Sequence, residues 1–417
     1  MTRVSRPDDI RRHNLALLLD SVHRFGPLTR AELTVRLGLN RSTVGVLVSE
    51  LCSLGLVEES VPAAADREQR AGRPSHVVRP RSDGPYGIAV DVDVDRVTTA
   101  ALPLGGQLLA QRVVPVAGTV QSAGAVARAI ACEVAAVIEL VGTLSPGAWP
   151  VGVGVSIPGT VRTADGIVEV APNLQWWNVP LAAMLTDLLT DLLPAGLPVA
   201  LANDADLGVL AEHLRGAATD AVDVVYLNGK VGVGAGIIID GRPLGGAGGL
   251  AGEIGHTVLD PAGPPCHCGG RGCVENYIGE TALLHLAGRS GAPSAESTAA
   301  VLAAAEAGDP AALEGVNRVA DSLGSVLANL VNMLNPRVIV LGGALRDVFR
   351  VAPSGVLAAL DLQAMNAARR MVEIRISGLE GDSSLVGAGE LALRPLLADP
   401  SAVAVGPGAG PVVLAQH

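Results

Sequence analysis

Residues 248–275 read GGLAGEIGHTVLDPAGPPCHCGGRGCVE, and this stretch contains three of the five cysteines in the 417-residue chain. Cys266, Cys268 and Cys273 follow a CxC(x4)C spacing, with glycines between them that allow tight turns. Three thiolates so close in sequence can bind one metal ion, and His256 would complete a tetrahedral Cys3His set of the kind that binds Zn2+. We therefore predict a zinc site at these four residues. The alternative is a tight loop with three unligated thiols.

From Tyr86 onward, apolar β-branched runs alternate with Ala- and Leu-rich segments. Such runs are typical of buried strands, and the segments between them suit the covering helices of an α/β fold. Two groups of strands follow one another, which predicts two lobes with a cleft between them. We place the first lobe at 86–205 and the second at 206–384, with a last helix at 385–397 that can return to the first lobe. The tail, 400–417, is predicted to be disordered.

The N-terminal segment, residues 1–81, has a different pattern that predicts three helices. Apolar residues recur at helical spacing within 10–25, where a Gly-Pro pair ends the pattern. Thr29 stands three residues before Glu32, which is a capping box and opens a second helix. Asn40 can cap a third helix, which has a buried apolar stripe.

A hairpin is predicted after the third helix, with strands LVEES (56–60) and SHVVRP (75–80) around the polar tip ADREQRAGRP (65–74). Three helices and a hairpin predict a winged helix-turn-helix. The alternative is another small helical domain with a hairpin, which would give a similar sequence pattern. In such a domain the start of the recognition helix enters the major groove, and a wing arginine can enter the minor groove. The predicted DNA-binding residues are Arg41, Ser42 and Thr43 in the helix and Arg73 in the wing.

The formal charge is distributed unevenly along the chain. The whole chain has a net charge of −11, but residues 1–81 contain 13 arginines against nine acidic residues, a net charge of +4. The remaining residues therefore have a net charge of −15. Attraction to phosphates needs only local positive charge. The asymmetry thus indicates a nucleic-acid-binding head on an acidic body.

Residues 248–275, together with LANDADLG at 201–208, resemble the signature of the ROK family of sugar kinases, open reading frames and repressors. The resemblance extends over about 86–395, and the predicted winged head matches the one carried by the family's transcriptional regulators. It implies an actin-like, ribonuclease H-like sugar-kinase fold of two lobes. In that fold the sugar lies in the cleft between the lobes.

The resemblance also implies a set of sugar-binding residues, namely Gly159, Asn203, Asp204, Glu253, His256 and Glu275. His256 would bind a sugar hydroxyl with one ring nitrogen and zinc with the other. Glu253 lies three residues before it, so both face one pocket if this stretch starts a helix. Asp204 matches the general base of the family's kinases. Trp176 and Trp177 can either stack on a sugar face or pack in the core.

Both phosphate loops depart from the pattern of the family's kinases. Those kinases carry Asp-x-Gly-Gly-Thr after the first strand, where glycines let backbone amides approach the phosphates. Here residues 91–95 read DVDVD, so side chains replace the glycines and carboxylates stand where phosphates would lie. Mg2+ can bridge carboxylates, but the lost glycines would still obstruct the approach. The second loop reads Lys230-Val231-Gly232 in place of Gly-Thr-Gly, and Lys230 is the only lysine in the chain.

Two functions remain open on this basis. The first is a repressor of carbohydrate-metabolism genes that a monosaccharide releases from operator DNA. The second is an ATP-dependent sugar kinase with a regulatory DNA-binding head. Sensing of a partner protein instead of a sugar also occurs in the family's repressor branch. The altered phosphate loop and the head favour the repressor without kinase activity. The expected partners are operator DNA, a sugar effector and further copies of the chain in a homodimer or higher oligomer.

The sequence also predicts where the protein is found. No apolar run approaches the roughly 20 residues of a membrane span, and the start MTRVSRPDDI has no apolar signal core. We therefore expect no membrane contact and a cytoplasmic protein. Cys52 and Cys132 lie in apolar patterns and are expected in the core, whereas His267 is expected to face solvent.

Overall fold

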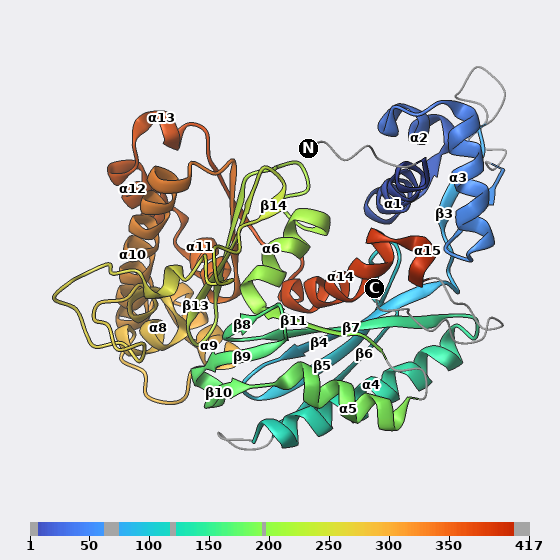
Figure 1. Ribbon diagram of the computed structural model, residues 1–417. Helices are drawn as coiled ribbons and strands as arrows, with labels where there is room; N and C mark the ends of the chain where they lie inside the picture. Colours follow the sequence, from blue (N-terminus) through green and yellow to red (C-terminus); the bar gives the residue numbers. More distant parts are fainter. Residues whose placement is uncertain (1–6, 62–74, 117–121, 194–196, 404–417) are drawn as a thin grey trace.

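The computed structural model describes residues 7–61, 75–116, 122–193 and 197–403 (Figure 1). In Figure 1 the N-terminal head (blue) lies against helix α14, Ser383–Ala398 (red), and the two lobes lie below and to the left of the head. The predicted class is confirmed, because a winged helix domain precedes two mixed sheets covered by helices.

The head has the predicted order of three helices followed by a hairpin. Its elements are α1 Pro7–Phe25, β1 Leu28–Thr29, α2 Arg30–Leu37, α3 Arg41–Ser53, β2 Val57–Ser60 and β3 Val77–Pro80. The three strands form an antiparallel sheet in the order β1-β3-β2. The capping box is confirmed, because Thr29 Oγ1 accepts from Glu32 N–H and the Glu32 carboxylate accepts from Thr29 N–H. Asn40 caps α3 by accepting from Thr43 N–H at 2.8 Å.

The core of the head continues into the body of the molecule. Leu18, Leu19 and Val48 of the head are completely buried, and they belong to the same apolar cluster as Leu393 and Leu396 of α14 (Ser383–Ala398). Burial of apolar surface is the main driving force of association. The head is therefore packed onto α14 and is not held by a linker alone.

The first lobe contains a five-stranded sheet in the order β11-β7-β4-β5-β6. Strands β4, β7 and β11 are parallel, and β5 and β6 add to the edge as antiparallel strands. A smaller antiparallel sheet, β10-β9-β8, follows β7 along the chain. The elements are β4 Pro85–Val92, β5 Arg96–Pro103, β6 Ala110–Pro115, α4 Ala123–Leu144, β7 Trp149–Ile157, β8 Thr160–Arg162, β9 Ile167–Ala171, β10 Trp176–Val179, α5 Leu181–Leu192 and β11 Val199–Asn203.

The second lobe repeats this topology with the order β14-β13-β12-β15-β16. Strands β12, β15 and β16 are parallel, and β13 and β14 are antiparallel to their neighbours. Its elements are α6 Asp204–Arg215, β12 Val224–Gly229, β13 Val233–Ile239, β14 Arg242–Pro243, α7 Glu275–Ile278, α8 Glu280–Leu286, α9 Ala295–Glu306, α10 Pro310–Leu334, β15 Val338–Gly342, α11 Gly343–Val351, α12 Pro353–Gln363, α13 Asn366–Arg369 and β16 Glu373–Ile376. Since α6 begins directly after β11, we draw the lobe boundary near residue 205.

Helices α6 and α14 lie against each other where the two lobes meet (Figure 1). Helix α14 packs on β4 and β7 of the first lobe, and α6 packs on β12 and β13 of the second. A Cβ at Gly387 of α14 would overlap the backbone carbonyl of Leu207 in α6. Such close approach needs a residue without a side chain. The two helices therefore form a tightly packed pair between the lobes.

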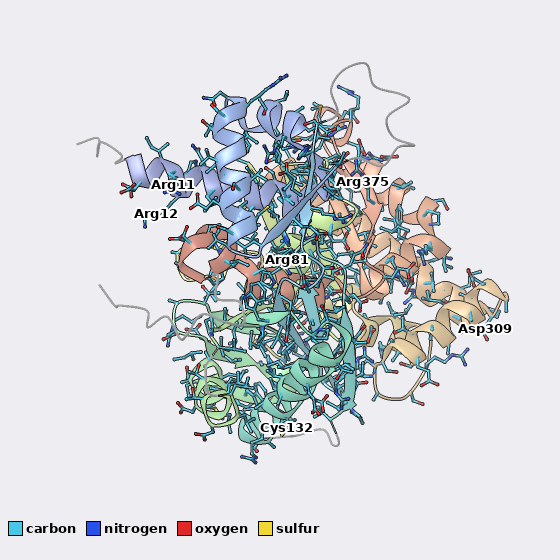
Figure 2. The ribbon with its side chains drawn as sticks, turned by 90° about the vertical axis from the view of Figure 1, so that its right-hand side faces the viewer. Arg11, Arg12, Arg81, Cys132, Asp309 and Arg375 are labelled. Carbon is cyan, nitrogen blue, oxygen red and sulfur yellow. The ribbon has the colours of Figure 1, made fainter. Side chains whose placement is uncertain are left out.

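Two expectations about single segments need correction. Residues 400–403, placed in a disordered tail, form a short helix, α15 Pro400–Val403, and residues 404–417 lie outside the described part. Cys132 is exposed, because it shares the solvent face of α4 with Arg128 and Glu139 while the neighbouring turns bury Ile130 and Val134 (Figure 2). Cys52 is partly buried. Among the described helices, none is long and apolar enough to cross a membrane.

Candidate functional site

A cavity of about 740 Å3 lies between the first and second lobes. Its walls come from the turn after β7, from the β9–β10 connection, and from the β12–β13 turn and the cysteine-rich loop of the second lobe. Pockets of a few hundred to about 1,000 Å3 are of the size that takes a small molecule. The structure places all six residues of the expected sugar-binding set on this wall, namely Gly159, Asn203, Asp204, Glu253, His256 and Glu275.

Both polar groups of the Asn203 side chain are hydrogen-bonded to nearby backbone groups. Its Nδ2 donates to the carbonyl oxygen of Gly159 at 2.9 Å, and its Oδ1 accepts from the N–H groups of Ala205 and Asp206 at 2.8 and 3.2 Å. A Cβ at Gly159 would overlap the carbonyl oxygen of Val170. Asn203 therefore joins the start of α6 to the Pro158-Gly159 turn across the mouth of the cavity, and it shapes this wall through its hydrogen bonds.

Asp204 and Asp206 occupy the first turn of α6 and carry perturbed carboxyl groups. Burial raises the pKa of Asp204 to about 6, and the nearby Lys230 ammonium opposes that rise. Burial raises the pKa of Asp206 to about 7, with further increases from the charges of Asp204 and Glu253. Carboxyl groups with pKa values near neutrality gather at functional sites because desolvation and like charges coincide there.

Asp206→Asn is expected to stabilise the protein at alkaline pH. Its folded pKa of about 7 lies above the unfolded value, so the folded state takes up a proton as the pH falls through 7, and the cost of burying the charge disappears. The variant should therefore gain on the order of 2 kcal/mol at pH 8 and much less at pH 5. Urea unfolding at both values measures this, with Asp187→Asn on the exposed face of α5 as control. Equal effects at both pH values would contradict the interpretation.

Glu253 and His256 lie on a single 3-10 turn, Ile254–His256, instead of the α-helix that the sequence suggested. Two glycines explain the difference, since Gly252 before the turn has a positive φ of 92° and Gly255 within the turn packs against the carbonyl of Val233. Residues three apart eclipse each other in a 3-10 helix. Both side chains therefore line the cavity, and burial raises the pKa of Glu253.

The expected metal ligands come together in the structure. The ligand atoms of His256, Cys266, Cys268 and Cys273 all lie within 4.8 Å of one another. Cys268 Sγ and Cys273 Sγ are 3.7 Å apart, as are Cys266 Sγ and His256 Nδ1. A tetrahedral ion with bonds of about 2.3 Å to sulfur places its ligand atoms roughly 3.8 Å apart. The donor set thus fits a tetrahedral metal ion.

The loop backbone also supports these sulfur atoms. Cys268 N–H lies 3.5 Å from Cys266 Sγ, and Gly270 N–H lies 3.4 Å from Cys268 Sγ. Gly269 and Gly272 have positive φ values of 91° and 67°, which only glycine adopts readily. The backbone can therefore turn three sulfur atoms toward one point.

His267 is exposed, as expected, and it also contacts residues of the cavity wall. Its side chain is 47% exposed, yet its Nδ1 lies 3.1 Å from Glu275 Oε1, and its ring packs edge-on against the His256 ring. Glu275 also accepts from Cys266 Sγ at 2.9 Å. His256, His267 and Glu275 form a second group with metal-ligand spacing beside the first. Glu275 therefore connects the cysteine loop to the cavity wall.

The altered phosphate loop contains an ion pair between the lobes. Asp93 in the β4–β5 turn of the first lobe accepts from Lys230 Nζ in the β12–β13 turn of the second at 3.2 Å, and Asp91 Oδ2 lies 3.8 Å from the same nitrogen. Burial alone would raise the pKa of Asp93, but Lys230 and Arg96 lower it below its usual value. A second cavity, of about 650 Å3, lies beyond this ion pair and shares Asp93 and Lys230 with the first.

The two adjacent tryptophans have different environments. Trp176 is 3% exposed and belongs to the core of the first lobe, whereas Trp177 is 61% exposed and lines the cavity. Asn173 and Gln175 line the same wall and were not expected from the sequence. Their only signal was the run of polar residues around the tryptophans in PNLQWWN. Adjacent strand residues point to opposite faces, which accounts for the division between Trp176 and Trp177.

The head presents the expected residues at the start of α3. Arg41 and Ser42 are exposed and Thr43 is half-buried. Ser42 Oγ donates to the capping oxygen of Asn40 at 2.6 Å, so the first turn of α3 is ordered by its own side chains. Arg73 lies outside the described residues.

Comparison with known families matches both parts of the chain. The sequence profile of the ROK family matches residues 88–394, and that of the MarR family matches residues 16–67. The first match covers both lobes together with α14. The second falls on the head.

Individual relatives include regulators and a kinase. The putative xylose repressor of Caldicellulosiruptor sp. (strain Rt8B.4) is 26% identical over 408 residues, which are 94% of this chain and 98% of the relative. The glucokinase of Halalkalibacterium halodurans is 32% identical over 255 residues, which are 58% of this chain and 76% of the relative. A crystal structure of a ROK family transcriptional regulator, a homologue of the E. coli MLC protein, has a TM-score of 0.75 at 25% identity and covers 93% of this chain and 97% of its own.

Proposed function

We propose, from the premise that this chain belongs to the ROK family, that it is a sugar-responsive transcriptional repressor. The observation that carries the proposal is a winged head packed on α14 in the same chain as a cavity lined by carboxyl, imidazole and amide groups. The repressor relative aligns along both parts of the chain, whereas the glucokinase aligns over 58% of it. A DNA-binding output joined to a small-molecule site is what an effector-controlled repressor requires.

The cavity suits a monosaccharide effector. Carboxylates accept hydrogen bonds from sugar hydroxyls, and Asp204, Glu253 and Glu275 supply them from three elements of the second lobe, namely α6, the 3-10 turn and α7. His256 directs Nδ1 toward the cysteine cluster, which leaves Nε2 for the cavity. The exposed ring of Trp177 offers an apolar face on the opposite wall. We propose that a sugar lies between these walls and favours a closer approach of the lobes.

We propose Zn2+ as the ion held by His256, Cys266, Cys268 and Cys273. A Cys3His set is typical of structural zinc sites, in which the ion stabilises the fold of a loop. Bound there, it would fix the ring of His256 and the loop that leads into Glu275, both on the cavity wall. The ion would therefore order two sugar contacts without taking part in a reaction.

We propose that the chain lacks sugar kinase activity. A kinase needs a loop that is open to nucleotide phosphates. Here the loop contains Asp91 and Asp93, and both carboxylates pair with Lys230 of the other lobe. A phosphate group would have to displace Lys230 from two carboxylates and would then meet their negative charge. Asp204 thus serves as an effector contact in place of a catalytic base.

The head is proposed to bind operator DNA as part of a homodimer or higher oligomer. One head offers a small contact surface, so two heads on half-sites separated by whole helical turns give the required affinity. Binding should weaken steeply as salt concentration rises, because phosphate contacts release counterions. The wing, including Arg73, is proposed to add minor-groove contacts.

Arg41→Ala is expected to weaken operator binding by about 1–3 kcal/mol, or roughly 5–150-fold, if the guanidinium reaches a base edge. The side chain is exposed at the start of α3, where a recognition helix meets the major groove. Fluorescence anisotropy with a duplex selected on the parent from a random library measures the change. Arg318→Ala, on the exposed face of α10 in the second lobe, is the control and should bind as the parent does. Parent-like binding by the Arg41 variant would contradict the assignment.

The test of the proposed function is an operator titration with and without sugar. D-xylose, D-glucose and N-acetyl-D-glucosamine are screened first by thermal shift, since a ligand of the folded state stabilises it by mass action. The active sugar should lower operator affinity roughly 5–150-fold, and operator DNA should lower sugar affinity by the same factor. Glu253→Gln should keep DNA binding but lose this response. A sugar that binds the cavity and leaves the operator isotherm unchanged contradicts the mechanism.

A further inference from the structure

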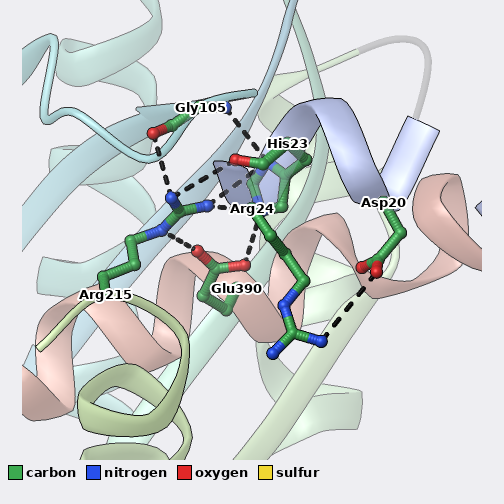
Figure 3. A network of polar contacts seen from close by, with 6 residues as sticks. All are labelled: Asp20, His23, Arg24, Gly105, Arg215 and Glu390. Atoms are coloured by element: carbon green, nitrogen blue, oxygen red, sulfur yellow. Dashed lines mark hydrogen bonds and ion pairs between the residues drawn. The ribbon is translucent and has the colours of Figure 1, made fainter. Parts of the chain in front are cut away.

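A buried polar cluster joins the head to both lobes, and we call it the joint: His23 of α1, Gly105 after β5, Arg215 of α6 and Glu390 of α14 (Figure 3). His23 Nε2 lies 2.8 Å from Glu390 Oε2, and Arg215 Nε donates to Glu390 Oε1. The side chains of His23 and Glu390 are 1% and 2% exposed. Four segments far apart in the sequence therefore meet at one point.

The hydrogen bonds at the joint fix the orientation of each group. Gly105 N–H donates to His23 Nδ1 at 3.0 Å, and His23 Nε2 lies 2.8 Å from Glu390 Oε2 and 2.6 Å from Arg215 Nη2. Arg215 Nη1 donates to the carbonyl oxygen of Gly105 at 3.0 Å and lies 3.4 Å from that of His23. Burial would raise the pKa of Glu390, but His23 and Arg215 hold it below its usual value. The carboxylate is therefore ionised, and it binds both the head and α6.

Room for Arg215 is provided by the turn after β5. Gly105 and Gly106 have positive φ values of 94° and 82°, and a Cβ at Gly106 would overlap the Arg215 guanidinium. The guanidinium thus fits into a space that the two glycines create. Both the Gly105-Gly106 turn and Arg215 of α6 are therefore shaped for this contact, and Arg215 is not a flexible surface arginine.

Helix α6 connects the joint to the cavity. Its first residue, Asp204, lines the cavity, and its last, Arg215, is in the joint, so its 12 residues span about 18 Å. One turn before its end, Glu212 is completely buried and accepts from the hydroxyls of Ser377 and Ser383 at 2.5 and 2.8 Å. These two serines belong to the segment that leaves β16 of the second lobe and enters α14. The end of α6 is therefore fixed to the second lobe, to α14 and to the head.

We propose that Arg215 is a positioning residue through which movement of α6 at the effector cavity changes the orientation of the DNA-binding head. The inference rests on the proposed function, since it requires a ligand in the cavity. When the lobes move relative to each other, α6 must shift together with Glu212 and Arg215. Glu390 of α14 and His23 of the head then shift as well, because Glu390 is hydrogen-bonded to both Arg215 and His23. Two heads reoriented in this way no longer match the spacing of two half-sites.

The experiment compares the parent chain with the double variant Arg215→Gln/Glu390→Gln. Changing both residues removes the guanidinium and the carboxylate together, so no buried charge is left unpaired. Operator titrations are run with and without the sugar that shifts the melting temperature of the parent among D-xylose, D-glucose and N-acetyl-D-glucosamine. The parent should lose operator affinity roughly 5–150-fold with sugar. The double variant should bind sugar with a parent-like Kd and show less than about a twofold change in operator affinity.

The controls separate a positioning role from a structural one. Arg112→Gln removes an arginine–carboxylate pair between β6 and α4, with a Nε to Oε2 distance of 2.7 Å, and should respond to sugar as the parent does. His23→Gln changes the joint from the side of the head and should also lose the effect of sugar on operator affinity. This variant tests the proposal if the double variant does not fold. A purely structural role would lower the melting temperature and leave the sugar response intact, and that result overturns the proposal.

Amide exchange distinguishes failure of the joint from failure of the proposed function. In the parent, sugar should slow exchange around the cavity and change exchange in α1 and at Gly105. In the double variant only the cavity should respond. Protection of the cavity with unchanged exchange in α1 of the parent overturns the joint and leaves the effector site in place. No change anywhere in the parent with any of the three sugars contradicts the effector site itself, and the joint with it.

Discussion

Cys273→Ser is expected to abolish metal binding, from about one zinc ion per chain in the parent to none. Cys273 is 1% exposed, and its sulfur lies 3.7 Å from that of Cys268. A serine oxygen is a much weaker zinc ligand than a thiolate, and structural zinc contributes directly to folding free energy. The melting temperature should fall by roughly 5 °C or more, which corresponds to about 4 kcal/mol in a chain of this size. Sugar affinity should fall at least roughly tenfold, because His256 and Glu275 lose their support.

Metal analysis of protein purified without chelator, followed by melting curves, measures these effects. Cys132→Ser is the matched control, since Cys132 is exposed on α4 in the first lobe and has no part in the cluster. That variant should keep the metal, the melting temperature and the sugar affinity of the parent. Metal-free parent protein that melts at the same temperature as Cys273→Ser would show that no such site exists.

Features encoded by neighbouring residues could be predicted from the sequence. The capping box of Thr29 and Glu32 was predicted and is present, because a helix cap depends on residues within one turn. The same holds for the cysteine loop, where the spacing and the glycines place the sulfur atoms within reach of one another. The α/β class followed from the alternation of apolar strands and helices. The expected orientation of Cys132 was wrong, because composition indicated an apolar helix but not which face packs on the sheet.

Features that depend on distant residues could not be predicted in this way. Arg215 is 192 residues from His23 and 175 from Glu390, and no local pattern relates the three. Lys230 is recognisable in the sequence only as the lysine of the altered second loop, and its pairing with Asp93 across 137 residues appears only once the two lobes are placed. The six expected residues of the cavity wall could be identified only because the sequence around them resembles that of the ROK family. Trp177 and Gln175 had no spacing that distinguished a cavity wall from a core.

Lys230→Met is expected to lower the free energy of unfolding by about 2–4 kcal/mol at pH 8. The ammonium group lies within ion-pair distance of Asp91 and Asp93, and it opposes the rise in the pKa of Asp204. Without it, three carboxylates face one another at the junction of the lobes with less compensating charge. Without Lys230 the pKa values of Asp93 and Asp204 rise, so the folded variant takes up protons as the pH falls. The deficit should therefore be largest at pH 8 and should shrink toward pH 5.

Urea unfolding at both pH values tests this expectation, and a double-mutant cycle with Asp93→Asn isolates the pair. Neutralising Asp93 removes one of the repelling charges, so Lys230→Met/Asp93→Asn should be more stable at pH 8 than Lys230→Met alone, with a coupling of about 1 kcal/mol or more. Arg96→Gln is the matched control, because Arg96 also approaches Asp93, at 3.9 Å, but is 47% exposed. An exposed pair contributes about 0–1 kcal/mol, so this variant should differ little from the parent. Equal losses for the Lys230 and Arg96 variants would mean that Lys230 is a surface charge and that it does not close the phosphate loop between the lobes.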